Sequence, residues 1–304
     1  MLSRSEHPDG PVPPHRPVGD DRPPTVRVVC QQLAPQVGDL SGNVEHAQAA
    51  VEEAAELGAD VVVLPELVTS GYVFASAQEA ASLAVDAQDD RLAAWGRAAR
   101  GAVVVGGFCE RGPDGRLFNS AAVVDATGVR AVYRKTHLWD AEKLVFTPGD
   151  APPPVVETAH GRLGVLVCYD LEFPEMTRTL ALAGAELLVV PTNWPLVRRP
   201  PGERPPEVVV AMAAARVNRM AVACCDRTGD ERGQAWTGGT TVVDAEGWPL
   251  AARTDAGPVV ADVPLGEARR KRLTDLADAL GDRRPELYGA LVAHPSTDES
   301  EHAR

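Results

Sequence analysis

The chain has 304 residues, of which 44% are hydrophobic and 24% are charged, as is typical of a globular protein with a large core. A formal net charge of −13 argues against a nucleic-acid-binding surface. No apolar run is long enough to span a membrane and the N-terminus lacks a secretory signal, so we expect a cytoplasmic protein that contacts neither a membrane nor nucleic acid.

The two ends of the chain differ in composition from the middle. Residues 1–24 contain seven prolines and few apolar side chains, which predicts a disordered, proline-rich tail. Residues 291–304 are predicted to be a flexible C-terminal tail. We therefore expect one folded domain over residues 25–290.

Five cysteines are present, and their odd number favours reduced thiols. No C-x-x-C motif and no closely spaced histidine pair indicates a metal site. We expect no metal and no cofactor.

Hydrophobic periodicity predicts alternating strands and helices in the first part of the chain. Strands are expected at residues 25–33 and 60–64, and helices at residues 41–58 and 89–100. Glu66 follows the second of these strands. Three adjacent strands are then expected at residues 102–109, 117–124 and 129–133, and Lys135 follows the last of them.

The second half opens with a short β-branched run at residues 163–167, which predicts a buried strand ending at Cys168. Pro174 and Glu175 mark the start of a helix over residues 174–183, because proline is tolerated and acid is favourable in a first turn. Later strands are expected at residues 186–190, 220–225, 240–244 and 259–263, and a helix at residues 205–219. This pattern predicts an α/β domain of two layered sheets flanked by helices.

Cys168 stands where a strand gives way to a helix, a place that can hold a nucleophile near backbone N–H groups. A cysteine at the end of a core strand is more often a small buried hydrophobe. Glu66 and Lys135 favour the functional interpretation, because a carboxylate, an amine and a thiol each follow a predicted strand. Ligand sites gather at such strand ends in open α/β sheets.

The stretches around Glu66, Lys135 and Cys168, in this order along the chain, resemble those of the nitrilase superfamily of carbon–nitrogen hydrolases. The similarity runs from about residue 26 to about residue 264 and includes the stretches 142–150, 191–195, 226–233 and 237–240. It implies a nitrilase-like, four-layer α-β-β-α sandwich and homo-oligomers, commonly dimers. It also implies a catalytic triad of Glu66, Lys135 and Cys168, with Glu142 orienting Lys135 or the substrate amide.

The resemblance implies hydrolysis of a carbon–nitrogen bond other than a peptide bond, with a small-molecule amide and water as reactants. Glu66 would take the thiol proton, and Lys135 and the backbone N–H of Tyr169 would hold the oxyanion of the attacked carbonyl. A cysteine thioester would follow, and water would release the carboxylic acid. The side chains expected to bind the substrate are Tyr72, His137, Trp139, Glu172, Phe173, Asn193 and Trp194.

The residues after Cys168 bear on the choice of substrate. True nitrilases of the superfamily usually carry Trp-Glu where this chain has Tyr169-Asp170, which favours the amidase and carbamoylase branches. Leu171 and Glu172 occupy the positions of two arginines that grip the substrate carboxylate in D-carbamoylases, which argues against an N-carbamoyl amino acid. We hypothesise that Glu172 faces the pocket and favours substrates with a cationic or amino group. The alternative for Glu172 is a salt bridge to Arg198 or Arg199.

Other functions stay open at this point. An N-carbamoyl amide hydrolase and a nitrilase are the nearest alternatives, and a soluble acyltransferase would use the same thioester. A non-catalytic scaffold of this fold predicts a damaged triad, whereas the triad residues are all present. A thiol redox protein is disfavoured because no resolving cysteine motif lies near Cys168.

Overall fold

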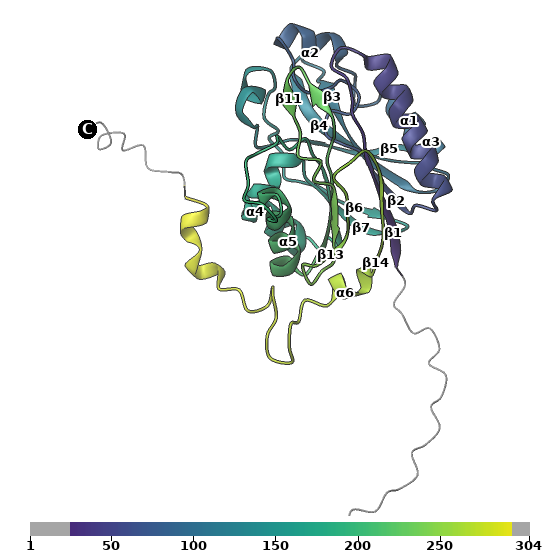
Figure 1. Cartoon of the computed structure of the whole chain (residues 1–304). Coiled ribbons are helices and arrows are strands. Elements are labelled where there is room, and N and C mark those ends of the chain that lie inside the picture. Colours follow the sequence, from purple (N-terminus) through teal and green to yellow (C-terminus); the bar gives the residue numbers. More distant parts are fainter. Residues whose placement is uncertain (1–24, 294–304) are drawn as a thin grey trace, which may run out of the picture.

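Two six-stranded sheets lie face to face between two pairs of helices, so the chain forms an α-β-β-α sandwich (Figure 1). The computed structural model describes residues 25–293. The four-layer fold expected from the sequence is confirmed.

The first sheet comes mainly from the first half of the chain and has the strand order β14-β1-β2-β3-β4-β5. Its three parallel strands are β1 (Val26–Gln32), β2 (Val61–Val63) and β3 (Val103–Arg111). Its antiparallel strands are β4 (Leu117–Asp125), β5 (Gly128–Arg134) and β14 (Gly257–Val263).

The second sheet has the order β13-β12-β9-β8-β7-β6. Its parallel strands are β7 (Gly161–Val165), β8 (Leu187–Pro191) and β9 (Ala221–Cys225). Its antiparallel strands are β6 (Val155–Thr158), β12 (Thr241–Val243) and β13 (Pro249–Ala252). A small separate hairpin pairs β10 (Asp230–Glu231) with β11 (Gln234–Ala235).

Helices cover the outer face of each sheet. The first sheet is covered by α1 (Leu40–Glu56) and α3 (Asp90–Ala98), and the second by α4 (Pro174–Leu182) and α5 (Pro206–Asn218). The shorter helices are α2 (Ala77–Leu83) and α6 (Leu265–Arg269), with 3₁₀ turns η1 (Asp140–Leu144), η2 (Cys168–Glu172), η3 (Pro285–Leu287) and η4 (Gly289–Leu291).

Strand alternation divides the core between the layers. Along β2, Val61 and Val63 pack between the two sheets, whereas Val62 and the following Leu64 pack toward α1 and α3. Successive side chains of a strand point to opposite faces, so a continuous apolar run is buried on both sides. The end of β2, and with it Glu66, is therefore fixed by both layers.

The main predicted strands and helices are confirmed, with ends that differ by a few residues. The prediction did not include α2, β6, β13, the 3₁₀ turns or the β10–β11 hairpin. All five cysteines are free and buried. The predicted tail over residues 1–24, and all but three residues of the predicted tail over residues 291–304, lie outside the described part of the chain, so the domain boundaries stay a prediction.

Within residues 25–293, no helix combines the length and the apolar character needed to cross a membrane.

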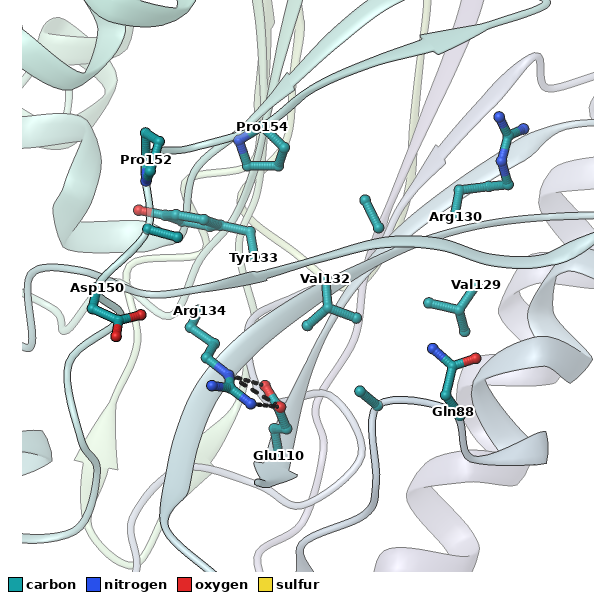
Figure 2. Close-up of a pocket in the computed structure, with 13 residues that line it drawn as sticks. Gln88, Glu110, Val129, Arg130, Val132, Tyr133, Arg134, Asp150, Pro152 and Pro154 are labelled. Atoms are coloured by element: carbon teal, nitrogen blue, oxygen red, sulfur yellow. Dashed lines mark hydrogen bonds and ion pairs between the residues drawn. The ribbon is translucent and has the colours of Figure 1, made fainter. Parts of the chain in front are cut away.

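A groove of about 400 Å³ runs along β5, at the outer edge of the first sheet (Figure 2). Arg134 and Glu110 pair across its floor, where Arg134 Nε donates to Glu110 Oε2 over 3.0 Å. Neither Glu66, Lys135 nor Cys168 lines this groove. It is therefore separate from the site that the sequence predicts.

Candidate active site

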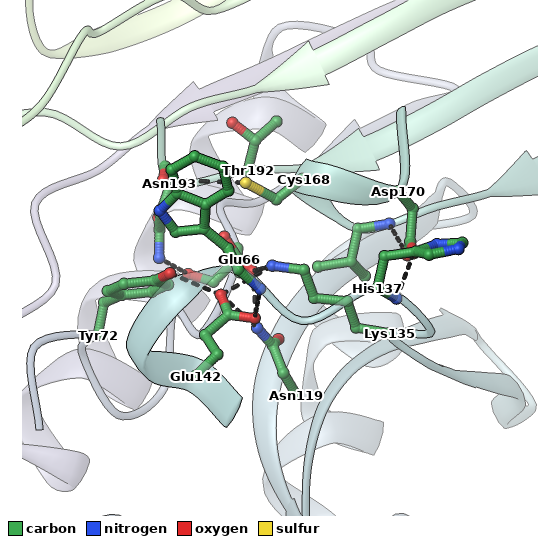
Figure 3. A network of polar contacts seen from close by, with 12 residues as sticks. Glu66, Tyr72, Asn119, Lys135, His137, Glu142, Cys168, Asp170, Thr192 and Asn193 are labelled. Carbon is green, nitrogen blue, oxygen red and sulfur yellow. Dashed lines mark hydrogen bonds and ion pairs between the residues drawn. The ribbon is translucent and has the colours of Figure 1, made fainter. Parts of the chain in front are cut away.

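Three loops bring the predicted triad together at the ends of strands from both sheets (Figure 3). Glu66 follows β2 and Lys135 directly follows β5, both in the first sheet. Cys168 follows β7 in the second sheet and begins η2. The site therefore lies where the two sheets meet.

Lys135 is fully buried and is paired with two carboxylates. Its Nζ donates to Oε1 of Glu66 over 2.7 Å and to Oε1 of Glu142 over 2.8 Å. Burial favours the neutral amine, but the charges of Glu142 and Glu66 together outweigh it and hold the pKa of Lys135 well above its ordinary value. Lys135 is therefore a fixed ammonium group inside the protein.

Glu66 has one engaged oxygen and one free oxygen. Its Oε1 also accepts a hydrogen bond from Asn119 Nδ2 over 2.6 Å, whereas its buried Oε2 has no hydrogen-bond partner among residues 25–293. Burial raises the pKa of Glu66 to about 7, although Lys135 opposes the shift. A carboxylate with this pKa and a free oxygen is suited to proton transfer at neutral pH.

Besides Lys135, Glu142 is held by Tyr72, by Trp139 and, over 3.5 Å, by Asn119 Nδ2. Its Oε1 accepts from the Tyr72 hydroxyl over 2.6 Å, and its Oε2 accepts from the backbone N–H of Trp139 over 3.1 Å. Burial and the charges of Glu142 and Glu66 raise the pKa of Tyr72 well above its ordinary value. Glu142 is therefore buried against Lys135 and is not part of a surface pair with its neighbour Lys143.

Cys168 has an unusual backbone, with φ of +47°, in the left-handed region that few non-glycine residues adopt. Its Sγ lies 3.9 Å from the backbone oxygen of Asn193. Burial raises the pKa of the Cys168 thiol well above its ordinary value, and Glu66 adds to this shift while Lys135 opposes it. The resting thiol is therefore protonated and needs a base. Tyr169 follows in the first turn of η2, where backbone N–H groups have no partner inside the helix.

A cavity of about 190 Å³ opens beside Glu142. Tyr72 and Trp236 form part of its wall, with their rings in edge contact at a centroid distance of 5.3 Å. Most of the other lining side chains are apolar or aromatic: Val73, Phe74, Trp139, Ala141, Val145, Phe146 and Pro195. Apolar walls with a few polar groups at one end are typical of small-ligand sites.

Two of the predicted substrate-binding residues lie beside a neighbouring hollow of about 420 Å³. His137 stacks on Phe173, with a centroid distance of 3.6 Å and an interplanar angle of 12°. His137 Nδ1 lies 2.9 Å from Asp170 Oδ1, and Asp170 also accepts from the backbone N–H of His137. These contacts hold the His137 ring away from Glu66 and Lys135.

Two further residues expected to bind the substrate, Asn193 and Trp194, instead contact the loops that carry the site. Asn193 Nδ2 donates to the backbone oxygen of Glu66 over 2.9 Å. Trp194 is buried, and its backbone N–H donates to Asp226 Oδ1 over 2.9 Å. Neither lines the cavity beside Glu142, because their contacts fix the strand-end loops instead.

Glu172 also lies outside this cavity, contrary to the expectation from the sequence. In a 3₁₀ turn the residue three positions after Cys168 shares its face, and Glu172 comes one position later. Glu172 is exposed at the surface, but its carboxylate loses part of its hydration to neighbouring protein atoms, and this loss and the nearby charge of Glu207 raise the pKa of Glu172. Among residues 25–293, no ion pair links it to Arg198 or Arg199.

Asn119, Phe74 and Trp236 are not among the site residues expected from the sequence. Asn119 lies opposite Lys135 in the first sheet, where the backbone N–H of Lys135 donates to its carbonyl over 2.8 Å. The sequence could have indicated Asn119, because a polar amide stands out inside the apolar run of β4. Trp236 follows the β10–β11 hairpin, whose two-residue strands have no detectable periodicity.

Comparison with known proteins shows the family of the chain. The family profile described as carbon–nitrogen hydrolase matches residues 27–272. A protein named nitrilase from Pyrococcus abyssi is 35% identical over 269 residues, covering 86% of this chain and 99% of its own. An (R)-stereoselective amidase from Pseudomonas sp. is 34% identical over 275 residues, covering 89% and 96%.

Solved structures give the same result. The amidase of the nitrilase superfamily from Nesterenkonia AN1 superposes with a TM-score of 0.75 at 32% identity, covering 89% of this chain and 98% of that one. Another structure of that amidase is a complex with butyramide.

The fold and the site define a nitrilase-superfamily enzyme of the amidase type. The chain belongs to the carbon–nitrogen hydrolase family and hydrolyses the carbon–nitrogen bond of amides.

Proposed function

We propose that this protein hydrolyses small primary amides to a carboxylic acid and ammonia, with Cys168 as the nucleophile. The observation that carries the proposal is the buried network in which Glu66 and Glu142 share the Lys135 ammonium next to a protonated thiol. This network supplies a base, a fixed positive charge and a nucleophile in one place.

The first half-reaction forms a thioester. The free Oε2 of Glu66 takes the thiol proton while the Cys168 sulfur attacks the amide carbon. The carbonyl electrons move to the oxygen, which Lys135 and the backbone N–H of Tyr169 stabilise. When the tetrahedral intermediate collapses, the carbon–nitrogen bond breaks and Glu66 passes its proton to the departing ammonia.

The second half-reaction consumes water. Glu66, again a carboxylate, takes a proton from water as its oxygen attacks the thioester carbon. The carbon–sulfur bond breaks, and the proton on Glu66 returns to Cys168 as the acid leaves. Glu142 transfers no proton and orients Lys135, which agrees with its contacts to Tyr72 and Trp139.

A short, neutral acyl group suits the cavity of about 190 Å³ beside Glu142. Tyr72 and Trp139 of the expected set border it, and they offer aromatic surface rather than charge. The butyramide bound by the Nesterenkonia AN1 amidase is a ligand of this kind. Nitriles are a second candidate class, because the 35% identical Pyrococcus abyssi relative is named nitrilase.

The test is ammonia release from butyramide, an amino acid amide, an N-carbamoyl amino acid and butyronitrile, with a Cys168→Ala protein beside the natural one. We expect turnover of butyramide that disappears in the variant. Turnover that survives in Cys168→Ala would contradict the mechanism, and exclusive turnover of butyronitrile would replace the amide by a nitrile as substrate.

We also propose that the protein acts as a homodimer or higher homo-oligomer in the cytoplasm. Apolar side chains near the C-terminal end support this, since Leu276 is 96% exposed and Val292 is 85% exposed. The free cysteines agree with a reducing compartment. Sedimentation velocity would test the assembly, and a single monomeric species at micromolar concentration would refute it.

A further inference from the structure

A buried ion pair next to the active site has no role in the reaction as described so far. Arg227 and Glu231 are both buried, and Arg227 Nη1 lies 3.1 Å from Glu231 Oε2. Arg227 lies shortly before the β10–β11 hairpin, and Glu231 is the last residue of β10. Replacing such a pair by apolar residues often costs nothing in stability, so its presence calls for another explanation.

Glu231 holds the backbone of the segment that forms one cavity wall. Its Oε2 accepts from the N–H of Tyr72 over 2.9 Å and from the N–H of Val73 over 2.7 Å. At Gly71, where φ is +75°, a Cβ atom would lie 2.6 Å from Glu231 Oε1. The carboxylate thus occupies space that only glycine leaves open.

Arg232, the residue after Glu231, also binds this backbone segment. Arg232 Nη1 donates to the backbone oxygen of Val73 over 2.9 Å and to Glu79 Oε2 over 2.8 Å. The N–H and the C=O of Val73 are therefore both bound by consecutive residues of the hairpin segment. The position of Tyr72 depends on this segment.

Arg227 is itself fixed from two directions. Its guanidinium lies over the ring of Trp236 at 4.6 Å, and its Nη2 donates to the backbone oxygen of Pro35 over 2.6 Å. Trp236 in turn contacts the edge of the Tyr72 ring. One connected set of contacts thus runs from Arg227 to the residue whose hydroxyl binds Glu142.

We propose that Glu231, held by Arg227, is a positioning residue for amide hydrolysis. It fixes the backbone at residues 72–73, so that the Tyr72 hydroxyl stays on Glu142 Oε1 and Glu142 stays on Lys135. The inference rests on the proposed function, because only there does the position of Lys135 matter. Its requirement is specific: an acceptor oxygen must be present at residue 231.

A matched pair of variants tests whether the acceptor oxygen at residue 231 is required. Arg227→Met/Glu231→Gln and Arg227→Met/Glu231→Leu both remove the buried charges, so neither leaves an unpaired ion. Only the glutamine retains an oxygen that can accept from Tyr72 and Val73. We expect the leucine version to lose about 100-fold in kcat relative to the glutamine version, the scale of effect for an ångström-sized misplacement. Equal kcat values for the two would overturn the proposal.

The route through Tyr72 has its own test. If Glu231 acts through the Tyr72 hydroxyl, adding Tyr72→Phe to the leucine version should cause little further loss, because both changes break one chain of contacts. Losses that multiply would refute this route. Glu186→Gln serves as the control. Like Glu231, Glu186 is a buried carboxylate that accepts from a backbone N–H, that of Arg162, and is paired with an arginine, Arg269. It lies directly before β8. This substitution should lower the melting temperature and leave kcat unchanged.

Amide hydrogen exchange separates this inference from the proposed function. The N–H groups of Tyr72 and Val73 should exchange faster in the leucine version than in the glutamine version, whether or not either protein turns over an amide. Equal protection of these two amides in the leucine and glutamine versions would refute the positioning role. Failure of the natural protein on the amide panel would instead refute the proposed reaction, while the difference in exchange would still show that Glu231 restrains the backbone at residues 72–73.

Discussion

At the scale of single residues, the site depends on one positive charge shared between two acids. Lys135 donates to Glu66 and to Glu142, and Asn119 donates to Glu66 from the neighbouring strand. Burial raises the pKa of Glu66 to about 7, and the hydrogen bonds from Lys135 and Asn119 limit the rise. Glu66 therefore changes charge near neutral pH.

This pKa predicts an acid limb in the pH profile of kcat/KM. Only the carboxylate form of Glu66 can take the thiol proton, so kcat/KM for a neutral amide should rise with pH and level off above about 7. Initial rates between pH 5 and 9 measure it, and Glu66→Gln should abolish turnover. A limb centred near 4.5, the ordinary pKa of a glutamate, would contradict the role of burial.

Asn119→Leu should move that limb. The hydrogen bond from Asn119 lowers the pKa of Glu66, so its loss should raise the pKa and shift the limb to higher pH. The variant should also lose about 1–3 kcal/mol of unfolding free energy, since a buried acceptor loses a donor. Asn218→Leu is the control: Asn218 is a buried amide bonded to Thr177 and the backbone of Ala214. It should lose stability with no shift of the limb.

At the scale of elements, β3 sets the position of Glu66 through Gly107, the second of two adjacent glycines. A Cβ at Gly107 would lie 2.4 Å from the backbone nitrogen of Leu67 and 2.5 Å from the Cα of Glu66. A Cβ at Gly106 points to the other face, where it would lie 2.9 Å from the ring of Trp95. The strand thus packs against the backbone of the catalytic loop on one side only.

Gly107→Ala should therefore displace Glu66. We expect kcat/KM to fall about 100-fold, because backbone atoms cannot move aside without shifting the base. The unfolding free energy should fall by about 1–3 kcal/mol through overpacking. Gly106→Ala should show a similar stability loss by urea titration with normal kcat/KM; if it is equally inactive, the strand affects activity through stability alone.

The sequence predicts the larger elements because their signals are local. Apolar runs and alternation locate the strands before Glu66, Lys135 and Cys168 without tertiary information. The β10–β11 hairpin and η1 have no such signal, because each is short and is held by contacts to distant residues such as Tyr72. The orientation of Glu172 depends on a 3₁₀ turn beginning at Cys168, which periodicity does not distinguish from the loop before α4.

At the scale of the whole molecule, the strand pairing of the sandwich begins at the first residue of β1. Pairing of β1 with β14 begins at Val26 opposite Val263, and the core lies between and around the two sheets. The family profile begins at residue 27. The proposed catalytic residues Glu66, Lys135 and Cys168 lie in the interior of this range.

Removal of residues 1–24 should accordingly leave the enzyme intact. Among residues 25–293, the strand pairs of the sandwich begin at Val26, so the melting temperature and kcat should match those of the full chain. Differential scanning calorimetry and the butyramide assay measure both. A drop in either would assign a structural or catalytic role to this segment.

The division of the site between the sheets has a consequence for the protein during its synthesis. Glu66, Lys135 and Glu142 follow strands of the first sheet, whereas Cys168 follows a strand of the second. With the roles proposed above, a chain synthesised only as far as β6 carries the base and the ammonium group but not the nucleophile. The first sheet also takes its edge strand β14 from residues 257–263, so both sheets are completed late in synthesis, and the thiol of Cys168 meets Glu66 and Lys135 only in the finished sandwich.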